Sequence, residues 1–205
     1  MSLEDGLRLV KLRGEAMQEA AEVGKQLMVS VVGLDEEKLE GLCQEAKEAE
    51  EDGVCQISNL LFPSGFSVGG TEKSVLRLKD LVEKAGALQA KILKTSGAFH
   101  TPLMQPAQDK LAAALEEALP NMKPPRHTVW MNATAGPMRP GCNPKDIVEL
   151  LKRQLTNPVM WEPSIKAIIM EGVKEFYEVG PQKQIKAMMK RIDQVSWKAT
   201  TNVEV

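Results

Sequence analysis

The sequence predicts an α/β protein in which a ferredoxin-like βαββαβ unit is inserted into a larger α/β unit. Between residues 25 and 97, strand-like and helical segments follow one another in the order of that split unit. Residues 98–205 alternate helical and strand-like segments, which indicates a parallel sheet. We therefore assign residues 1–24 and 98–205 to one domain and residues 25–97 to a subdomain within it.

The composition excludes several classes of protein. A net charge of −2 over 205 residues leaves no basic stripe for nucleic acid. No apolar run approaches the roughly 20 residues that span a bilayer. Cys43, Cys55 and Cys142 show no CxxC spacing and accompany only two histidines, so neither a metal site nor a disulfide framework is expected. The N-terminal residues resemble neither a secretory signal nor a transit peptide, and free thiols favour a reducing, intracellular compartment.

The N-terminal segment is typical of an amphipathic helix. Ser2 and Asp5 have the spacing of a capping box. Arg13 lies at the edge of the apolar stripe and has two interpretations. It is either a surface arginine whose stem packs on apolar neighbours or a clamp that binds a carboxylate through two parallel hydrogen bonds. The predicted stripe consists of Leu3, Leu7, Val10, Gly14, Met17 and Ala21.

The inserted unit is bounded by turn and cap signals. Thr71 is a candidate helix cap, and Gly86 is a candidate helix stop. The predicted strands are residues 26–34, 54–62, 66–68 and 87–95, and the predicted helices are residues 35–53 and 71–86.

A loop of small residues, Ser96-Gly97-Ala98-Phe99-His100-Thr101, follows the last of these strands. Histidine has the side-chain pKa closest to neutrality, so His100 is a candidate general base; a capping or packing role is the alternative. An amphipathic helix is expected from about residue 102 to residue 119.

The C-terminal region is predicted to alternate strands and helices. His127 stands beside prolines in a connector and is expected to be exposed. We expect strands at residues 128–136, 174–180 (buried) and 195–200, and helices at residues 143–155, 157–172 and 181–192.

Five segments, in the same order along the chain, resemble the malonyl-CoA:acyl-carrier-protein transacylase family. They are LRGEAMQEA, VCQISNLLFP, SGAFHTPLM, RQLTNPVMW and FYEVGP. The resemblance covers nearly the whole chain, is strongest for organellar eukaryotic members, and corresponds to the C-terminal two-thirds of the family. It implies an incomplete α/β-hydrolase-like core around the inserted subdomain.

The resemblance implies ping-pong transfer of a malonyl group from coenzyme A to the pantetheine thiol of acyl carrier protein, with no further cofactor. His100 would be the base, and the backbone carbonyl of Gln154 would orient its ring. Arg13 would bind the malonyl carboxylate. Asn59 aligns with an asparagine near the pocket, although capping of backbone groups at a strand end is an equal alternative.

The family's nucleophilic serine lies in a G-x-S-x-G turn upstream of the arginine helix, and the resemblance implies that these residues lack it. Gly65-Phe66-Ser67-Val68-Gly69 matches the motif literally, but its position predicts a strand of the inserted unit, with Ser67 an ordinary strand residue.

Two functions therefore remain open. The chain is a transacylase of fatty acid synthesis that needs the missing strands, from a longer chain, another polypeptide or a larger assembly. Alternatively, it is a structural or interaction subunit that descends from one. In either case we expect the isolated chain to be inactive, and we favour a mitochondrion or plastid over the cytosol.

Overall fold

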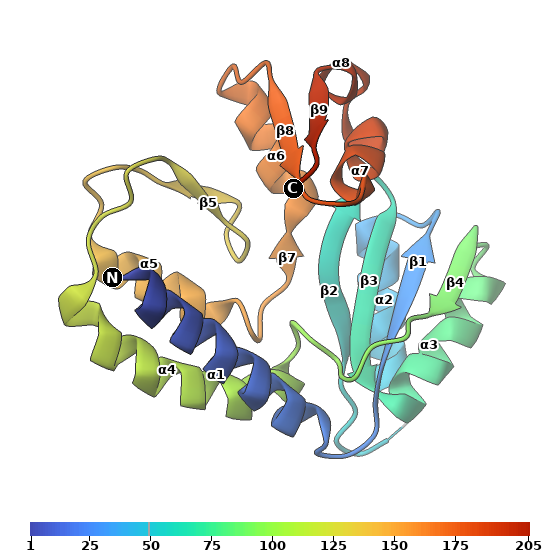
Figure 1. The fold of residues 1–205 in the computed structure, drawn as a ribbon. Helices are drawn as coiled ribbons and strands as arrows, with labels where there is room; N and C mark the ends of the chain where they lie inside the picture. The colour runs from blue at the N-terminus through green and yellow to red at the C-terminus, as the bar shows by residue number, and fades with distance from the viewer. Residues whose placement is uncertain (49) are drawn as a thin grey trace.

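The computed structural model describes residues 1–48 and 50–205 and has the predicted α/β architecture (Figure 1). Its central element is a mixed five-stranded sheet of order β4-β1-β3-β2-β7. Among the described residues, none of the helices is both long and apolar enough to cross a membrane. The strands of this sheet are β1 (Gln26–Val32), β2 (Cys55–Phe62), β3 (Gly65–Thr71), β4 (Gln89–Ile92) and β7 (Val159–Met160).

Four of these strands form the predicted ferredoxin-like arrangement. β1 pairs antiparallel with β3 and β4, and β2 pairs antiparallel with β3. The helices α2 (Glu36–Lys47) and α3 (Glu72–Lys84) cover one face (Figure 1). α3 ends where predicted, since Gly86 takes a φ of 90° that favours glycine. The helix predicted for residues 35–53 stops at Lys47, and Ala49 lies outside the described residues.

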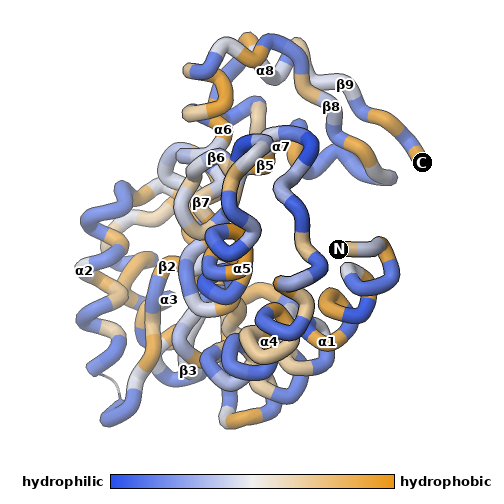
Figure 2. Tube along the Cα trace, turned by 90° about the vertical axis from the view of Figure 1, so that its left-hand side faces the viewer, coloured by the Kyte–Doolittle hydropathy of each residue, from blue (hydrophilic) through white to orange (hydrophobic). Residues whose placement is uncertain are grey.

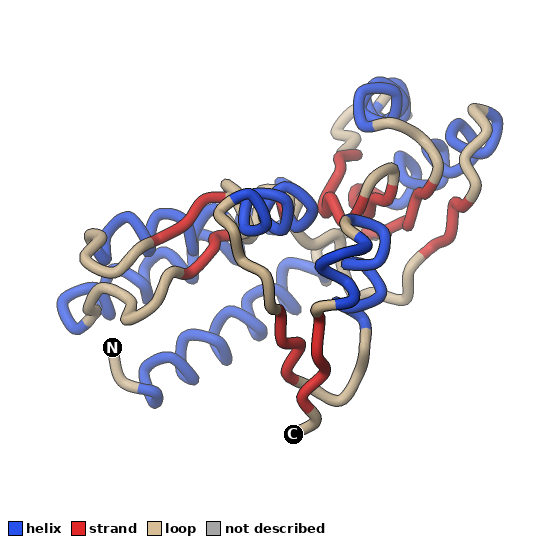
Figure 3. The backbone as a smooth tube through the Cα atoms, turned by 90° about the horizontal axis from the view of Figure 1, so that it is seen from above, coloured by secondary structure: helices blue, strands red, loops and turns tan. Residues whose placement is uncertain are grey.

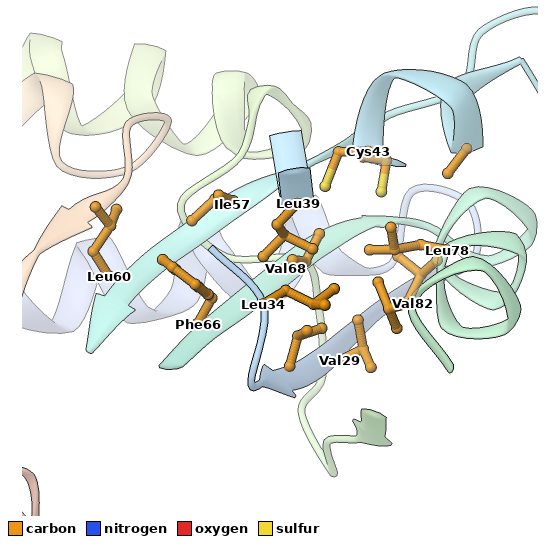
Figure 4. Packing of buried hydrophobic residues seen from close by; sticks show 14 residues of the cluster. Val29, Leu34, Leu39, Cys43, Ile57, Leu60, Phe66, Val68, Leu78 and Val82 are labelled. Atoms are coloured by element: carbon orange, nitrogen blue, oxygen red, sulfur yellow. The ribbon is translucent and has the colours of Figure 1, made fainter. Parts of the chain in front are cut away.

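A closed apolar core lies between this sheet and its two helices (Figure 4). Leu39 of α2 and Leu78 of α3 are fully buried. They pack on a sheet face that includes Val29 and Val68, which are paired across β1 and β3. We call β1–β4 together with α2 and α3 the sheet layer.

The second layer is helical and lies beside the first (Figure 3). We call it the helical layer; it consists of α1 (Leu3–Ala21), α4 (Gln105–Ala118) and α5 (Pro144–Arg153), with short 3-10 turns η1 (Pro102–Met104) and η2 (Leu119–Asn121). The predicted capping box at Ser2 and Asp5 is present. The predicted buried face of α1 is wrong at its N-terminal end, because Leu3, Leu7 and Val10 are 81%, 61% and 67% exposed.

α1 instead buries a neighbouring face against α4. Ala16 and Ala20 are buried there, with Leu9 and Leu12 packed against the same cluster. Blue and orange segments alternate along α1 in Figure 2. Because Leu3, Leu7 and Val10 are exposed while Leu9 and Leu12 are packed, apolar residues lie on more than one face of the helix. The partner helix, rather than the period alone, selected the buried face.

The C-terminal region differs most from the prediction. Residues 128–136 were expected as one strand, but they turn back as a hairpin of β5 (Val129–Met131) and β6 (Gly136–Met138), with Ala135 at a φ of 51°. Residues 195–200 were expected as a strand, but most of them lie in α8 (Gln194–Lys198), and β9 (Thr200–Val203) follows. The remaining elements are α6 (Trp161–Met170), β8 (Phe176–Val179) and α7 (Gln184–Ile192).

The parallel sheet expected for residues 98–205 is only partly present among the described residues: β8 and β9 pair in parallel, but as a separate two-stranded sheet, and β5 pairs with β6 in antiparallel. The strand was predicted to be buried, yet Tyr177 and Val179 are exposed and the buried side chain is Glu178. The Glu178 carboxylate accepts 2.8 Å hydrogen bonds from the backbone N–H groups of Ile185 and Lys186 in the first turn of α7. A polar anchor therefore joins this strand to its helix.

The segment around β7 was predicted as continuous helix. Val159 and Met160 instead pair with Asn59 and Leu60 of β2, in parallel. The sheet therefore includes a strand from outside residues 25–97, and the segment that follows α5 is joined to it.

Candidate functional site

The loop that carries His100 is fixed by hydrogen bonds on both sides of the histidine. The buried Thr101 hydroxyl donates to the Ala98 carbonyl at 2.6 Å, and the Leu103 N–H donates to the same hydroxyl oxygen. The Ala98 N–H donates to the Gln26 side chain at 3.0 Å. His100 itself has a φ of 60°, a conformation uncommon for residues other than glycine and often found at functional sites.

The loop packs closely on strand β3. A Cβ atom at Gly69 would lie 2.9 Å from Cγ2 of Thr101 and 3.4 Å from Cβ of Ala98. Any larger residue would displace the loop, so Gly69, the last glycine of the G-x-S-x-G match, serves close packing here.

The His100 ring is held by the C-terminal end of α5. Its Nδ1 lies 2.7 Å from the backbone carbonyl oxygen of Gln154, the C-cap residue of that helix. Carbonyl groups in the last turn of a helix lack intrahelical partners, so this one is free to accept. A carbonyl can only accept, and therefore Nδ1 carries the proton of the neutral ring and Nε2 keeps its lone pair.

The surroundings also keep the ring neutral near pH 7. Burial lowers the pKa of His100, and the positive charge of Arg13 lowers it further, while the bond to Gln154 acts in the opposite direction. An imidazole with a free Nε2 and a lowered pKa can accept a proton at neutral pH.

Arg13 lies close to this histidine on α1. Its Nε atom is buried without a hydrogen-bond partner among the described residues, and burial lowers the pKa of the guanidinium. The ion pairs found in residues 1–48 and 50–205 do not include it. A partly buried guanidinium whose Nε has no partner among the described residues is suited to an anionic ligand.

Arg13 and Gln154 line one mostly apolar cavity of about 380 Å³. The cavity lies between α1, α4 and α5. Since the Gln154 carbonyl also binds His100, the structure brings these three predicted residues together. The other lining residues are Met1, Leu3, Gly6, Leu7, Leu9, Val10, Leu111, Leu115 and Leu151.

Asn59 lies apart from that cavity, whose lining among the described residues does not include it. It follows an irregularity in the β2–β3 ladder, because Ile57 pairs with Val68 but Asn59 pairs with Ser67. The extra residue, Ser58, donates its hydroxyl to the Asn59 side chain at 3.0 Å. The predicted role of Asn59 beside the pocket stays a prediction.

Ser67 and His127 were predicted to have no catalytic role. Ser67 lies within β3, between paired strands on both sides, and not at a strand-to-helix turn. His127 is exposed in the connector before β5. Both positions agree with the sequence analysis.

Comparison with known proteins adds a family to this geometry. No protein-family model matches the chain. The mitochondrial malonyl-CoA-acyl carrier protein transacylase of Homo sapiens is 36% identical over 214 residues, which cover 100% of this chain and 54% of that protein. The malonyl CoA-acyl carrier protein transacylase of Bacillus subtilis is 35% identical, over 94% of this chain and 59% of that protein.

The chain is homologous to the malonyl-CoA:acyl-carrier-protein transacylases. It spans less than two thirds of the length of these relatives. The crystal structure of the Streptococcus pneumoniae transacylase superimposes with a TM-score of 0.89 at 33% identity, over 99% of this chain and 63% of that one. A type II polyketide malonyl-transacylase in complex with its acyl-carrier protein superimposes with a TM-score of 0.82 at 32% identity, over 97% of this chain and 60% of that one.

Homology to transacylases does not by itself identify the residues that support the histidine. Sequence reasoning missed Gln56, whose side-chain amide reaches the His100 carbonyl, and Thr101, which fixes the loop. Both lie within segments that resemble the transacylases: Thr101 directly follows His100, and Gln56 precedes Asn59 by three residues. Position alone could not show which of them point toward the histidine.

Proposed function

We propose that this chain forms part of a malonyl-CoA:acyl-carrier-protein transacylase of fatty acid synthesis. The observation that carries the proposal is the 2.7 Å contact between His100 Nδ1 and the Gln154 carbonyl, beside the unpaired Arg13. This arrangement provides a base and a fixed cation, which the transfer of a carboxylated acyl group requires.

In this proposal His100 Nε2 accepts the proton of a serine hydroxyl as the serine oxygen attacks the malonyl thioester carbonyl. The coenzyme A thiolate leaves and takes that proton from the imidazolium. The pantetheine thiol of the carrier protein then gives its proton to the same ring and attacks the acyl-serine ester. The serine oxygen leaves and takes that proton back, and the malonyl group stays on the pantetheine sulfur. The Gln154 carbonyl holds the tautomer and stabilises the imidazolium, as a carboxylate does in a serine-histidine-aspartate triad.

Arg13 binds the free carboxylate of the malonyl group through two parallel hydrogen bonds. Its buried Nε has no partner among the described residues, which supports a role for it in ligand binding. A guanidinium in these surroundings stays protonated and binds a planar carboxylate more specifically than an ammonium group.

The nucleophilic serine is proposed to come from outside these 205 residues, so the isolated chain should not turn over. Two observations support this. Ser67 lies within a strand of the sheet layer, and the exposed residues Leu3, Leu7 and Val10 leave an apolar face beside Arg13. An exposed apolar face of this kind indicates a surface that another segment or polypeptide covers.

The proposed acyl acceptor is an acyl carrier protein, as in the malonyl-transacylase complex that this chain resembles. The similarity to a mitochondrial human protein supports an organellar compartment. Malonyl-CoA is the proposed donor, and the chain requires no further cofactor in this scheme.

The test is a chimera in which these residues replace the matching part of the Bacillus subtilis transacylase. We expect malonyl transfer from malonyl-CoA to holo-acyl-carrier protein, reduced by on the order of 10³-fold in His100→Ala. The isolated chain should give none. A folded chimera without malonyl transfer would contradict the proposal and favour the interaction-subunit alternative.

The same chimera tests the clamp. Arg13→Ala should lower kcat/KM for malonyl transfer on the order of 10²-fold, because a desolvated charge pair is lost, and should affect acetyl transfer much less. Arg13→Lys keeps the charge but loses the planar guanidinium group, so its kcat/KM for malonyl transfer should lie between those of wild type and Arg13→Ala. Equal losses for both acyl groups would remove the clamp role.

A further inference from the structure

The side chain of Gln56, on β2, connects the two segments that determine the position of the His100 ring. Its Nε2 donates to the carbonyl oxygen of His100 itself at 3.1 Å. It also donates to the carbonyl oxygen of Thr156 at 3.4 Å. Thr156 lies two residues after Gln154, whose carbonyl binds the ring.

The second segment has an anchor of its own. The Thr156 hydroxyl donates to the Gln108 side chain on α4 at 2.6 Å. The backbone of His100 and its ring acceptor are thus held from β2, α4 and the C-terminal end of α5. Within this network, Gln56 is the side chain that contacts both the histidine loop and the segment after α5.

The chemistry of the site requires an amide at this position. Both acceptors are carbonyl oxygens, and one NH2 group supplies two N–H donors. An ionised glutamate offers acceptors only and would repel both carbonyls. Asparagine is one methylene shorter and, from the same backbone position, would not reach both oxygens.

We propose that Gln56 is a positioning residue for His100: it holds the left-handed conformation of the histidine and sets the distance between its ring and the Gln154 carbonyl. This inference rests on the proposed function for its catalytic meaning, but the geometry that it describes can be measured without catalysis. It acts through His100 and does not contact the acyl group.

A cavity also borders Gln56, so loss of this side chain would change the access of water to the site. Gln56 lines a cavity of about 530 Å³ between α2, β2 and residues 156–160, together with the polar side chains of Gln44 and Lys47. Loss of the two hydrogen bonds would remove the contact that joins the His100 carbonyl to β2 and would give water from this cavity a path toward the ring. Water around the imidazole stabilises its charged form and competes for Nδ1–H.

The experiment uses the 205-residue chain, labelled with ¹⁵N-histidine, and compares wild type with Gln56→Met and Gln56→Glu. The chain contains two histidines, so both rings can be followed by long-range ¹H–¹⁵N spectra, and the exposed His127 provides a reference resonance. In the wild type, His100 should show the tautomer protonated at Nδ1. In both variants, we expect a substantial population protonated at Nε2 and a titration midpoint displaced upward by at least about half a pH unit.

The matched control is Gln89→Met. Gln89 donates its amide to the Ser30 hydroxyl at 3.0 Å within the same sheet, but on the strand at its far edge. It should leave the His100 tautomer and midpoint unchanged.

A lower melting temperature in Gln56→Met with an unaltered His100 tautomer and midpoint would overturn the proposal, because it would mean that Gln56 only adds stability. If Gln56→Met does not fold, Gln56→Asn, which keeps a polar side chain but would not reach both carbonyl oxygens, gives the same comparison. In the chimera, Gln56→Met should lower kcat about tenfold or more with little change in KM. An inactive chimera with a shifted tautomer would refute the transacylase proposal and leave the positioning role intact.

Discussion

The sheet layer and the helical layer use their apolar residues in opposite ways. In the sheet layer, Leu39, Leu78 and Val68 are fully enclosed between the sheet and its two helices. In the helical layer, α1 buries one face against α4 but exposes Leu3, Leu7 and Val10 beside the cavity of Arg13. The layer with a complete core thus provides the scaffold, and the layer with an open apolar face carries the proposed ligand cation.

This difference implies where the molecule tolerates change. Shortening a side chain in the closed core leaves a cavity that the surrounding residues fill only in part. Shortening a side chain on the exposed face of α1 removes few contacts.

Leu39→Ala should lower the free energy of unfolding by about 3 kcal/mol, because its side chain is fully buried in the sheet layer. Leu7→Ala, the matched substitution on the exposed face of α1, should stay within about 0.5 kcal/mol of wild type. Urea unfolding followed by circular dichroism measures both. A large decrease in the free energy of unfolding for Leu7→Ala would mean that the α1 face is covered in solution, and it would contradict the difference between the two layers.

Glu178→Gln sharpens the comparison for the C-terminal sheet, which relies on a polar anchor. We expect the free energy of unfolding to fall by about 2 kcal/mol, because the carboxylate accepts charge-assisted hydrogen bonds from the first turn of α7. Burial opposes ionisation, but the N–H donors of Lys186 and Ile185 and the amide of Asn202 outweigh it and hold the pKa of Glu178 below its usual value.

The sign of the pH dependence follows from that direction. The contribution of Glu178 is fully present above the ordinary glutamate pKa of 4.5 and is lost as the pH falls through the lower folded-state pKa. The difference between wild type and Glu178→Gln should therefore shrink in acid. Glu175→Gln, at an exposed carboxylate that accepts from Tyr177, is the control and should show neither effect.

A smaller effect on the pH dependence of stability is expected for His100. Because the pKa of His100 is lowered by burial and by Arg13, against the Gln154 bond, its stabilising contribution is fully present above the ordinary value of 6.5 and declines as the pH falls. His100→Gln should remove this part of the acid sensitivity, and His127→Gln should not. Unfolding at pH 8 and pH 5.5 checks this, and identical pH profiles for wild type and His100→Gln would count against a lowered pKa.

Local signals in the sequence predicted local structure well. The capping box at Ser2, the helix stop at Gly86 and the order of elements in the inserted unit were all correct. Each depends on residues close together in the chain, where capping and alternation act directly. The contact of His100 with Gln154 was also predicted, but from resemblance to a family and not from the pattern.

Features that depend on distant partners could not be predicted in this way. On α1, two overlapping stripes fit a period of 3.6 residues, and only the docking of α4 selects the one with Ala16 and Ala20. The pairing of β7 with β2 joins residues a hundred positions apart, and two residues are too few to carry a periodic signal. Gln56 belongs to the same class, because its acceptors lie on two other segments.

The short strand β7 has a mechanical consequence. It begins five residues after Gln154 and is bonded to the edge of a sheet whose core belongs to the other layer. A hinge motion that opened the two layers would have to strip β7 from β2 or bend the chain between them. The carbonyl group that accepts from the imidazole is therefore joined to the sheet layer through β7.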